Sequence, residues 1–336
     1  MSKYPIAILI IVFGLIACKQ SATNTDPKKN VGEEVEPFVL QRAIQFDDRP
    51  IQSVHVGSDG KYYVGTLEGI YVYLPQYSDF GAVDNARTRI ISRIKTFNGR
   101  LYAINSRIKA IVSSADGLNW RNDVQLAYDI LDFSVMSADS VAILTTKGVF
   151  VGKSGEEGLV HYDFGMSEYS RLYMGSIAQT QTGMLFAGSS FGLYKSENQG
   201  QSWEVVNKEG SEGFSKINLL FVDRDNKLMV FEDYETIFTS SDEGQSWSEL
   251  PALDYDGYHL IQNSDDRFYL LTSYGVYVSD RAGNDFQRLP IQDFIEGSYV
   301  LSKFSISGDK IILSDGFSIY FGTINWDSQY WDDWDS

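Results

Sequence analysis

The stretch Ser240-Ser241-Asp242-Glu243-Gly244-Gln245-Ser246-Trp247 predicts a tight turn followed by a strand. Gly244 can supply the positive φ that such a turn needs. Ser240 and Asp242 are short acceptors that can bind the backbone N–H groups of the turn. Trp247 places a large apolar ring at the start of the next strand.

The same pattern recurs along the chain. Ser196–Trp203 repeats it almost completely, with Asn198 at the acidic position. Ser113–Trp120 is a degenerate copy, with Ala115 at that position, and Ser279–Phe286 has Phe in place of Trp. A repeated turn of this kind predicts a fold built from similar units.

The pattern S-x-D-x-G-x-S/T-W resembles the Asp-box, or BNR repeat, of sialidase-like β-propellers. The resemblance implies that each box joins the third and fourth strands at the edge of a blade, fixing the turn and packing its Trp. The residues to which it gives this structural role are Ser196, Asn198, Gly200 and Trp203, and Ser240, Asp242, Gly244 and Trp247.

A short strand with a central aliphatic residue recurs about every 40 residues, as blades of a propeller do. The seven aliphatic residues are Ile70, Ile108, Val149, Leu193, Ile237, Val276 and Ile319. Hairpin signals precede several copies, as at Ser53–Thr66 and Lys303–Ser314. We therefore predict an all-β fold, a seven-bladed β-propeller of four-stranded antiparallel blades.

Closure of the ring needs an outer strand for the seventh blade. Phe38–Gln41 has the character of such a strand without inner strands before it, so we expect it beside the C-terminal strand. The alternative is that Gln329–Trp334 serves instead. In the tail, we assign Trp326 to a strand, whereas Trp331 and Trp334 fit either a strand or a docking peptide.

The first residues have a different character. Residues 1–17 have a positive start and an apolar run, which indicates a signal peptide. Cys18, the only cysteine, follows directly, in a Leu-Ile-Ala-Cys sequence that resembles a bacterial lipobox. We expect an acylated Cys18, a flexible tether over 18–36 and a single propeller over 37–336.

A formal net charge of −17 makes nucleic acid an improbable partner, because such a surface repels phosphate. It would repel anionic lipid as well, so the membrane is contacted only through the lipid anchor. The expected location is the bacterial envelope, on the periplasmic or the outer side.

No catalytic residue can be assigned from the sequence. Sialidase chemistry needs an arginine triad, and the Arg-Ile-Pro motif is absent, since Arg93-Ile94-Lys95 and Arg107-Ile108-Lys109 lack the proline. No pair of Asp residues stands out for glycoside hydrolysis. His55 and His259 fall in equivalent inner strands, either as channel-lining groups or as ordinary strand residues. We predict no metal ion and no cofactor.

One position in the turn between the second and third strands carries aromatic residues in later blades. The candidate ligand-binding residues at or beside this position are Phe191, Tyr234, Glu235, Tyr274 and Phe317. Exposed aromatic rings suit stacking on a sugar or docking a partner. The other interpretation is that they cover the ends of the strands.

These features favour a non-catalytic envelope module that binds a protein or glycan partner through one face. The alternative is a glycoside hydrolase of the Asp-box type, sialidase-like or xyloglucanase-like. A second BNR family, the photosystem assembly factors, resembles the chain in architecture. Those factors use a basic patch, and the acidic charge of this chain argues against that role.

Overall fold

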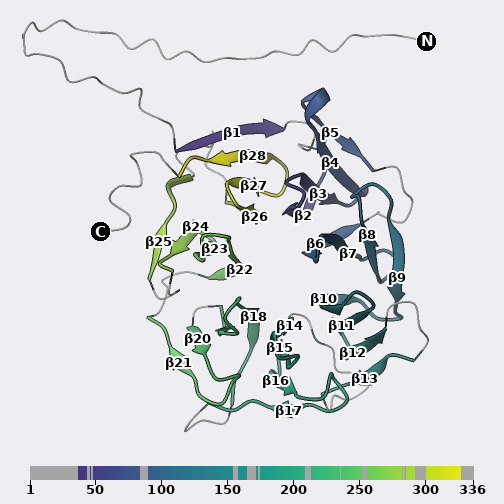
Figure 1. Cartoon of the computed structure of the whole chain (residues 1–336), viewed down its shortest axis with the longest axis vertical. Coiled ribbons are helices and arrows are strands. Elements are labelled where there is room, and N and C mark those ends of the chain that lie inside the picture. Colours follow the sequence, from purple (N-terminus) through teal and green to yellow (C-terminus); the bar gives the residue numbers. More distant parts are fainter. Residues whose placement is uncertain are drawn as a thin grey trace, which may run out of the picture. The chain divides into compact units, whose positions relative to one another are not determined.

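The computed structural model describes residues 37–43, 46, 48–83, 90–153, 158–164, 172, 175–208, 213–234, 236–251, 256–281, 283, 285–291 and 300–326. The chain divides into two units, Met1–Val35 and Glu36–Ser336, and all described residues belong to the second. They form seven four-stranded antiparallel sheets around one axis, which confirms the predicted seven-bladed propeller (Figure 1). Cys18, the tether, Glu235, Trp331 and Trp334 lie outside the described residues.

Each sheet is one blade, with strands A to D running from the axis outward. Blade one contains β2 (Ile51–Val56), β3 (Tyr62–Thr66), β4 (Ile70–Leu74) and β5 (Asp79–Ala82), with the short 3-10 helix η2 (Pro75–Tyr77) before β5. Blade two contains β6 (Ile91–Phe97), β7 (Arg100–Asn105), β8 (Ala110–Ser114) and β9 (Arg121–Gln125). Blade three contains β10 (Ile130–Ser137), β11 (Ser140–Thr145), β12 (Gly148–Lys153) and β13 (Val160–Tyr162).

The remaining blades follow the same order. Blade four contains β14 (Gly175–Gln179), β15 (Leu185–Ser189), β16 (Gly192–Ser196) and β17 (Glu204–Val205). Blade five contains β18 (Ile217–Val222), β19 (Leu228–Glu232), β20 (Thr236–Ser240) and β21 (Ser248–Glu249). Blade six contains β22 (Gly257–Gln262), β23 (Phe268–Thr272), β24 (Gly275–Ser279) and β25 (Phe286–Arg288). Blade seven contains β26 (Lys303–Ser307), β27 (Lys310–Ser314), β28 (Ile319–Ile324) and, as strand D, β1 (Phe38–Ala43).

The B strands are mostly apolar because both of their faces are covered. β23, with the sequence FYLLT, is buried at every position, and β3 likewise. Apolar side chains of adjacent blades meet in shared clusters, such as the one that joins Leu271 and Val276 of blade six to Leu313 of blade seven. A single blade could not cover both faces, so the ring is the unit that buries the core.

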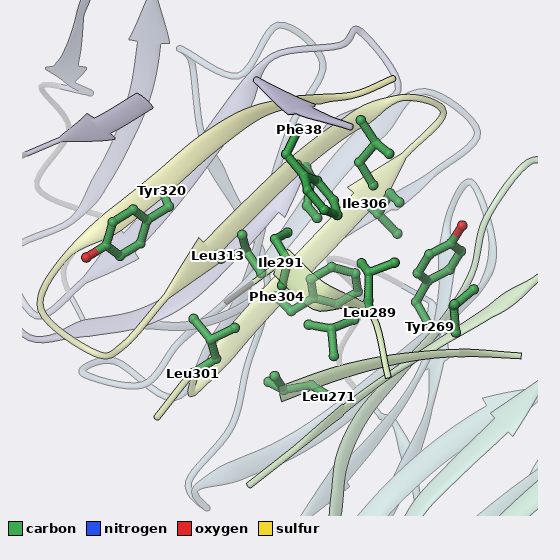
Figure 2. Packing of buried hydrophobic residues seen from close by; sticks show 14 residues of the cluster. Phe38, Tyr269, Leu271, Leu289, Ile291, Leu301, Phe304, Ile306, Leu313 and Tyr320 are labelled. Atoms are coloured by element: carbon green, nitrogen blue, oxygen red, sulfur yellow. The ribbon is translucent and has the colours of Figure 1, made fainter. Parts of the chain in front are cut away.

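The ring closes with β1. This strand pairs antiparallel with β28, from Phe38 opposite Ile324 to Ala43 opposite Ile319, as the sequence predicted for Phe38–Gln41. Phe38 is 5% exposed and packs in the cluster between blades six and seven (Figure 2). Trp326 lies just beyond β28 rather than in it, so its predicted strand assignment is wrong. Its ring contacts Tyr269, with centroids 6.3 Å apart.

The register predicted for blade two is also corrected. Arg107–Lys109 lies in a turn, and strand C begins at Ala110, which pairs with Asn105. The turn is longer here, and Lys109 has a φ of 54°, in the left-handed region. The periodic aliphatic residue of this blade is therefore Ile111 and not Ile108.

The turns between strands C and D are held by their own serine and acidic side chains. In blade five, Ser240 Oγ donates to Asp242 Oδ1 at 2.7 Å and accepts the N–H of Gly244 at 2.8 Å. Asp242 also accepts the N–H groups of Gln245 and Ser246. Hydrogen bonds, first that of the Ser246 side chain, lower the pKa of Asp242 to about 2. Ser196, Asn198 and Gly200 form the corresponding bonds in blade four.

Blade two has the same turn with one residue fewer before its glycine. Ser114 donates to Asp116 Oδ1 at 2.9 Å, and Asp116 accepts the N–H groups of Leu118 and Asn119. The assignment of Ala115 to the acidic position is therefore wrong, because the missing residue shifts the register and Asp116 takes the role.

The tryptophans of these turns differ in burial. Trp203 is 8% exposed, donates its indole N–H to Gly200 O at 3.2 Å and lies near Tyr162 and Phe164 of the preceding blade. Trp247 is only partly buried, and its indole nitrogen is enclosed without an acceptor among the described residues. Trp203 therefore joins neighbouring blades more completely than Trp247 does.

Candidate functional site

Strand direction sorts the connections of the blades into two ends. The A–B turns and the C–D turns lie at one end, while the B–C turns and the links between blades lie at the other. We call the second end the B–C face. The described ligand-binding candidates Phe191, Tyr234, Tyr274 and Phe317 belong to connections at this face, opposite the turns that hold Asp242 and Asn198.

A repeated hydrogen bond fixes the aromatic position in blades four and six. Ser189 Oγ accepts the N–H of Phe191 at 3.1 Å, and Thr272 Oγ1 accepts that of Tyr274 at the same distance. The next residue in blade four is Gly192, with a φ of 114°, and a Cβ there would come within 2.9 Å of Phe214 O. The backbone is thus held while the aromatic side chain projects outward.

Phe317 reaches the same face through a slightly different turn. Asp315 Oδ1 accepts the N–H groups of Phe317 and Ser318, at 2.8 and 2.7 Å. The exposed fractions are 50% for Phe191, 62% for Tyr274 and 55% for Phe317. These three large rings are therefore available to a ligand, one on each of blades four, six and seven.

Tyr234 occupies a different setting in blade five. Its φ is 72°, and its N–H donates to Asn218 Oδ1 at 2.8 Å. Its ring lies edge-on to Tyr258 of blade six, with centroids 6.4 Å apart, and Tyr258 is itself 45% exposed. The sequence pattern missed Tyr258, because it is the unpaired residue at the register shift between Gly257 and His259, which breaks the alternation of β22. Glu235 is outside the described residues.

A second candidate site lies on the axis. A cavity of about 530 Å³ is bordered by the A strands of blades two to six. The A-strand residues that pair with the penultimate residue of strand B occupy one level of the ring. In blade order these residues are Ser53, Arg93, Asp132, Ser176, Leu219, His259 and Phe304.

Their common register brings Arg93, Asp132 and Ser176 together from three successive blades. Asp132 Oδ1 lies 2.7 Å from both Arg93 Nη1 and Lys95 Nζ. Ser176 Oγ and the N–H of Ile177 donate to Asp132 Oδ2, at 3.0 and 3.1 Å. Asp132 is 1% exposed, and a buried carboxylate is costly unless its oxygens are paired. These contacts give both oxygens of Asp132 partners.

Burial and charge act in opposite directions in this network. Burial alone would raise the pKa of Asp132, but Arg93, Lys95 and the hydrogen bonds overcome it and hold that pKa well below its usual range. Burial lowers the pKa of Lys95, although Asp132 opposes the shift. The side chains of Arg93 and Lys95 remain 42% and 37% exposed because they border the cavity.

Of the two histidines that the sequence placed in equivalent inner strands, His259 lines the axial cavity, and His55 lies in strand A of blade one. Burial lowers the pKa of His55 and of His259 to about 4, and the charges of Arg93 and Lys95 contribute at His259. His55 Nε2 lies 2.7 Å from Thr96 Oγ1. Both rings are therefore neutral at pH 7.

Sequence reasoning considered Arg93 and Lys95 only as an incomplete sialidase motif. Their meeting with Asp132 depends on the bulge in each A strand, which a single sequence does not reveal. An alignment of the blades could have found them. It places Arg93 and Lys95 of blade two at the same strand positions as Asp132 and Ser134 of blade three. Among the described residues, no group of three His, Asp or Glu side chains is placed to hold a metal ion.

Seven four-stranded blades around one axis define the chain as a β-propeller. A family model described as "DUF6242 beta propeller domain" matches residues 82–254, more than half of the chain. The chain therefore belongs to the DUF6242 beta propeller family. No curated protein matches it.

Solved structures share the fold at low identity. The extracellular domain of the hybrid two component system BT4673 from B. thetaiotaomicron has a TM-score of 0.63 and 13% identity, over 81% of this chain and 38% of that one. The chain thus spans well under half of that domain. YCF48 from Cyanidioschyzon merolae has a TM-score of 0.60 and 12% identity, over 84% and 98%. Virginiamycin B lyase from Staphylococcus aureus has a TM-score of 0.63 and 11% identity, over 86% and 100%.

Proposed function

We propose that the chain is a non-catalytic binding module of the bacterial envelope, which recognises a glycan or a protein segment through its B–C face. The observation that carries this proposal is the exposure of Phe191, Tyr274 and Phe317 at one repeated position. Each ring is at least half exposed on a turn whose backbone is held by hydrogen bonds. Rigid, exposed rings can stack on a ligand at a small entropic cost.

The chemistry of the axial cavity supports binding over glycoside hydrolysis. Hydrolysis uses two carboxyl groups, one of which holds a proton for the leaving group. Asp132 is the carboxyl group that the described lining of the cavity contributes, and it is ion-paired with Arg93 and Lys95. Its lowered pKa keeps it ionised, so it is a poor general acid.

The envelope location rests on the sequence around Cys18 and on the extracellular character of one structural neighbour. Acylation of Cys18 would tether the propeller through residues 18–36. In the part of the chain that the structure describes, no helix has the length and apolarity to cross a membrane.

The test is a screen of the purified propeller on a glycan array and a peptide array, with hydrolysis of the bound glycans measured in parallel. Binding without product release is the expected outcome. Release of reducing sugar from any bound glycan would replace this proposal with the glycoside hydrolase alternative.

A further inference from the structure

The axial cavity has the size of a small-molecule site. Its volume of about 530 Å³ falls within the range of about 300–1,000 Å³ that is usual for ligand pockets. Its walls are A strands, each of which is hydrogen-bonded along its outer edge to strand B of its own blade and packed between the neighbouring blades. The cavity is therefore a built feature of the fold and is separate from the aromatic rings of the B–C face.

One side of the cavity carries more positive than negative charge. Arg93 and Lys95 border it, and Lys303 is close enough that Arg93, after burial, contributes to lowering the Lys303 pKa. Asp132 is the carboxylate that faces these cations, while His259 is neutral at pH 7. This local excess stands out in a chain whose net charge is −17. Partly buried cations without full compensation cost free energy, which an anion would recover.

Hydrogen-bonding capacity remains on these cations. Lys95 Nζ donates to Asp132 Oδ1 and to Phe133 O, which leaves the third N–H of its ammonium group for a ligand. Arg93 pairs with Asp132 through Nη1, and its guanidinium group has further N–H donors at Nε and Nη2.

The opposite wall is apolar. At the register positions that hold Arg93 and Lys95 in β6, β18 carries Leu219 and Phe221. Both line the cavity and are only partly buried. The two strands lie on different sides of the axis (Figure 1). The cavity thus presents cations on one side and hydrocarbon on the other.

We propose that the axial cavity binds a small organic acid, with its carboxylate against Arg93 and Lys95 and its apolar body against Leu219 and Phe221. Lys303 adds longer-range attraction. The occupant is therefore distinct from the glycan or protein segment proposed for the B–C face.

The probe is 2-naphthoate, titrated into the full propeller by calorimetry, with the uncharged 2-naphthamide as its isosteric partner. 2-Naphthoate is expected to bind at least about tenfold more tightly than 2-naphthamide, because a charge-assisted hydrogen bond has no equivalent for the amide. Equal affinity for the two probes, or no binding of 2-naphthoate at millimolar concentration, would overturn the proposal.

Two cavity variants locate the site. Lys95→Met is expected to weaken 2-naphthoate about tenfold and to leave 2-naphthamide unchanged, while Asp132 keeps its bonds to Arg93, Ser176 and Ile177. Phe221→Ala is expected to weaken both probes. The matched control is Lys195→Met, on β16 away from the axis, where the lysine pairs with Glu204. Affinity that is unaffected by Lys95→Met and Phe221→Ala, or is lost on removal of Phe191, Tyr274 and Phe317, would place the probe elsewhere and refute the inference.

Discussion

At the scale of single residues, the structure separates side chains that hold the fold from those that face a ligand. The side-chain oxygens of Asp242 and Asn198 accept hydrogen bonds from their own turns, so these residues stabilise the fold. Phe191 and Tyr274 come from equally well-held turns, but their rings face outward. The difference lies in which end of the blade each turn occupies.

Trp203 and Trp247 form a matched pair for testing the role of the outer turns. Trp203→Ala is expected to lower the free energy of unfolding by about 3–5 kcal/mol, because a well-buried aromatic ring leaves a cavity. Trp247→Ala should cost less, since Trp247 is only partly buried and its N–H has no acceptor among the described residues. Chemical denaturation of both variants measures this order. A larger loss for Trp247→Ala would contradict the account of their burial.

His55 and His259 make stability depend on pH. Their folded pKa values, about 4, lie below the ordinary value of 6.5, so the unfolded chain takes up protons first as the pH falls. We expect the free energy of unfolding to be steady above pH 6.5 and to decline between about pH 6.5 and 4. The double variant His55→Gln, His259→Gln should decline less over that interval. Equal slopes for variant and wild type in denaturation at stepped pH would refute this assignment.

At the scale of strands and blades, local chemistry explains what the sequence could predict. Turn residues such as Gly244 and Ser240 act within a few positions, so the repeat and the four-stranded blade follow from them. The turn at Lys109 and the shortened turn at Asp116 broke the expected spacing, and there the predicted register was wrong. The meeting of Arg93 with Asp132 depends on packing between blades, which no local pattern encodes.

The closing strand gives the test at this scale. A chain that begins at Phe46 lacks β1, so β28 loses its outer partner and keeps only β27, and the cluster between blades six and seven loses Phe38. We expect its free energy of unfolding to fall by at least about 3 kcal/mol, the usual cost of removing a buried Phe. A chain that begins at Glu36 is the control and should melt like the full-length protein. If both truncations melt alike, β1 does not close the ring.

At the scale of the whole molecule, we propose that net charge and a lipid anchor determine where the propeller binds its partner. A net charge of −17 is expected to repel nucleic acid and anionic lipid, while Arg93 and Lys95 place positive charge at the axial cavity. A lipid on Cys18 would supply a membrane attachment. The B–C face would then meet partners from a tethered position.

Replacement of Cys18 by Ser tests the anchor. The variant is expected to move from the membrane fraction to the soluble fraction, because one acylated residue provides the attachment. Immunoblotting of separated fractions checks this result. A variant that still sediments with membranes, with unchanged detergent extraction, would exclude the lipid anchor.

The central claim is that the aromatic rings of the B–C face form the recognition surface. The most direct measurement compares wild type with the triple variant Phe191→Ala, Tyr274→Ala, Phe317→Ala on the same glycan and peptide arrays. The control is Tyr77→Ala, which removes a ring that is 70% exposed at the opposite end of a blade. Ligands bound by wild type and by the control are expected to be lost from the triple variant. The same binding pattern in all three proteins would contradict it.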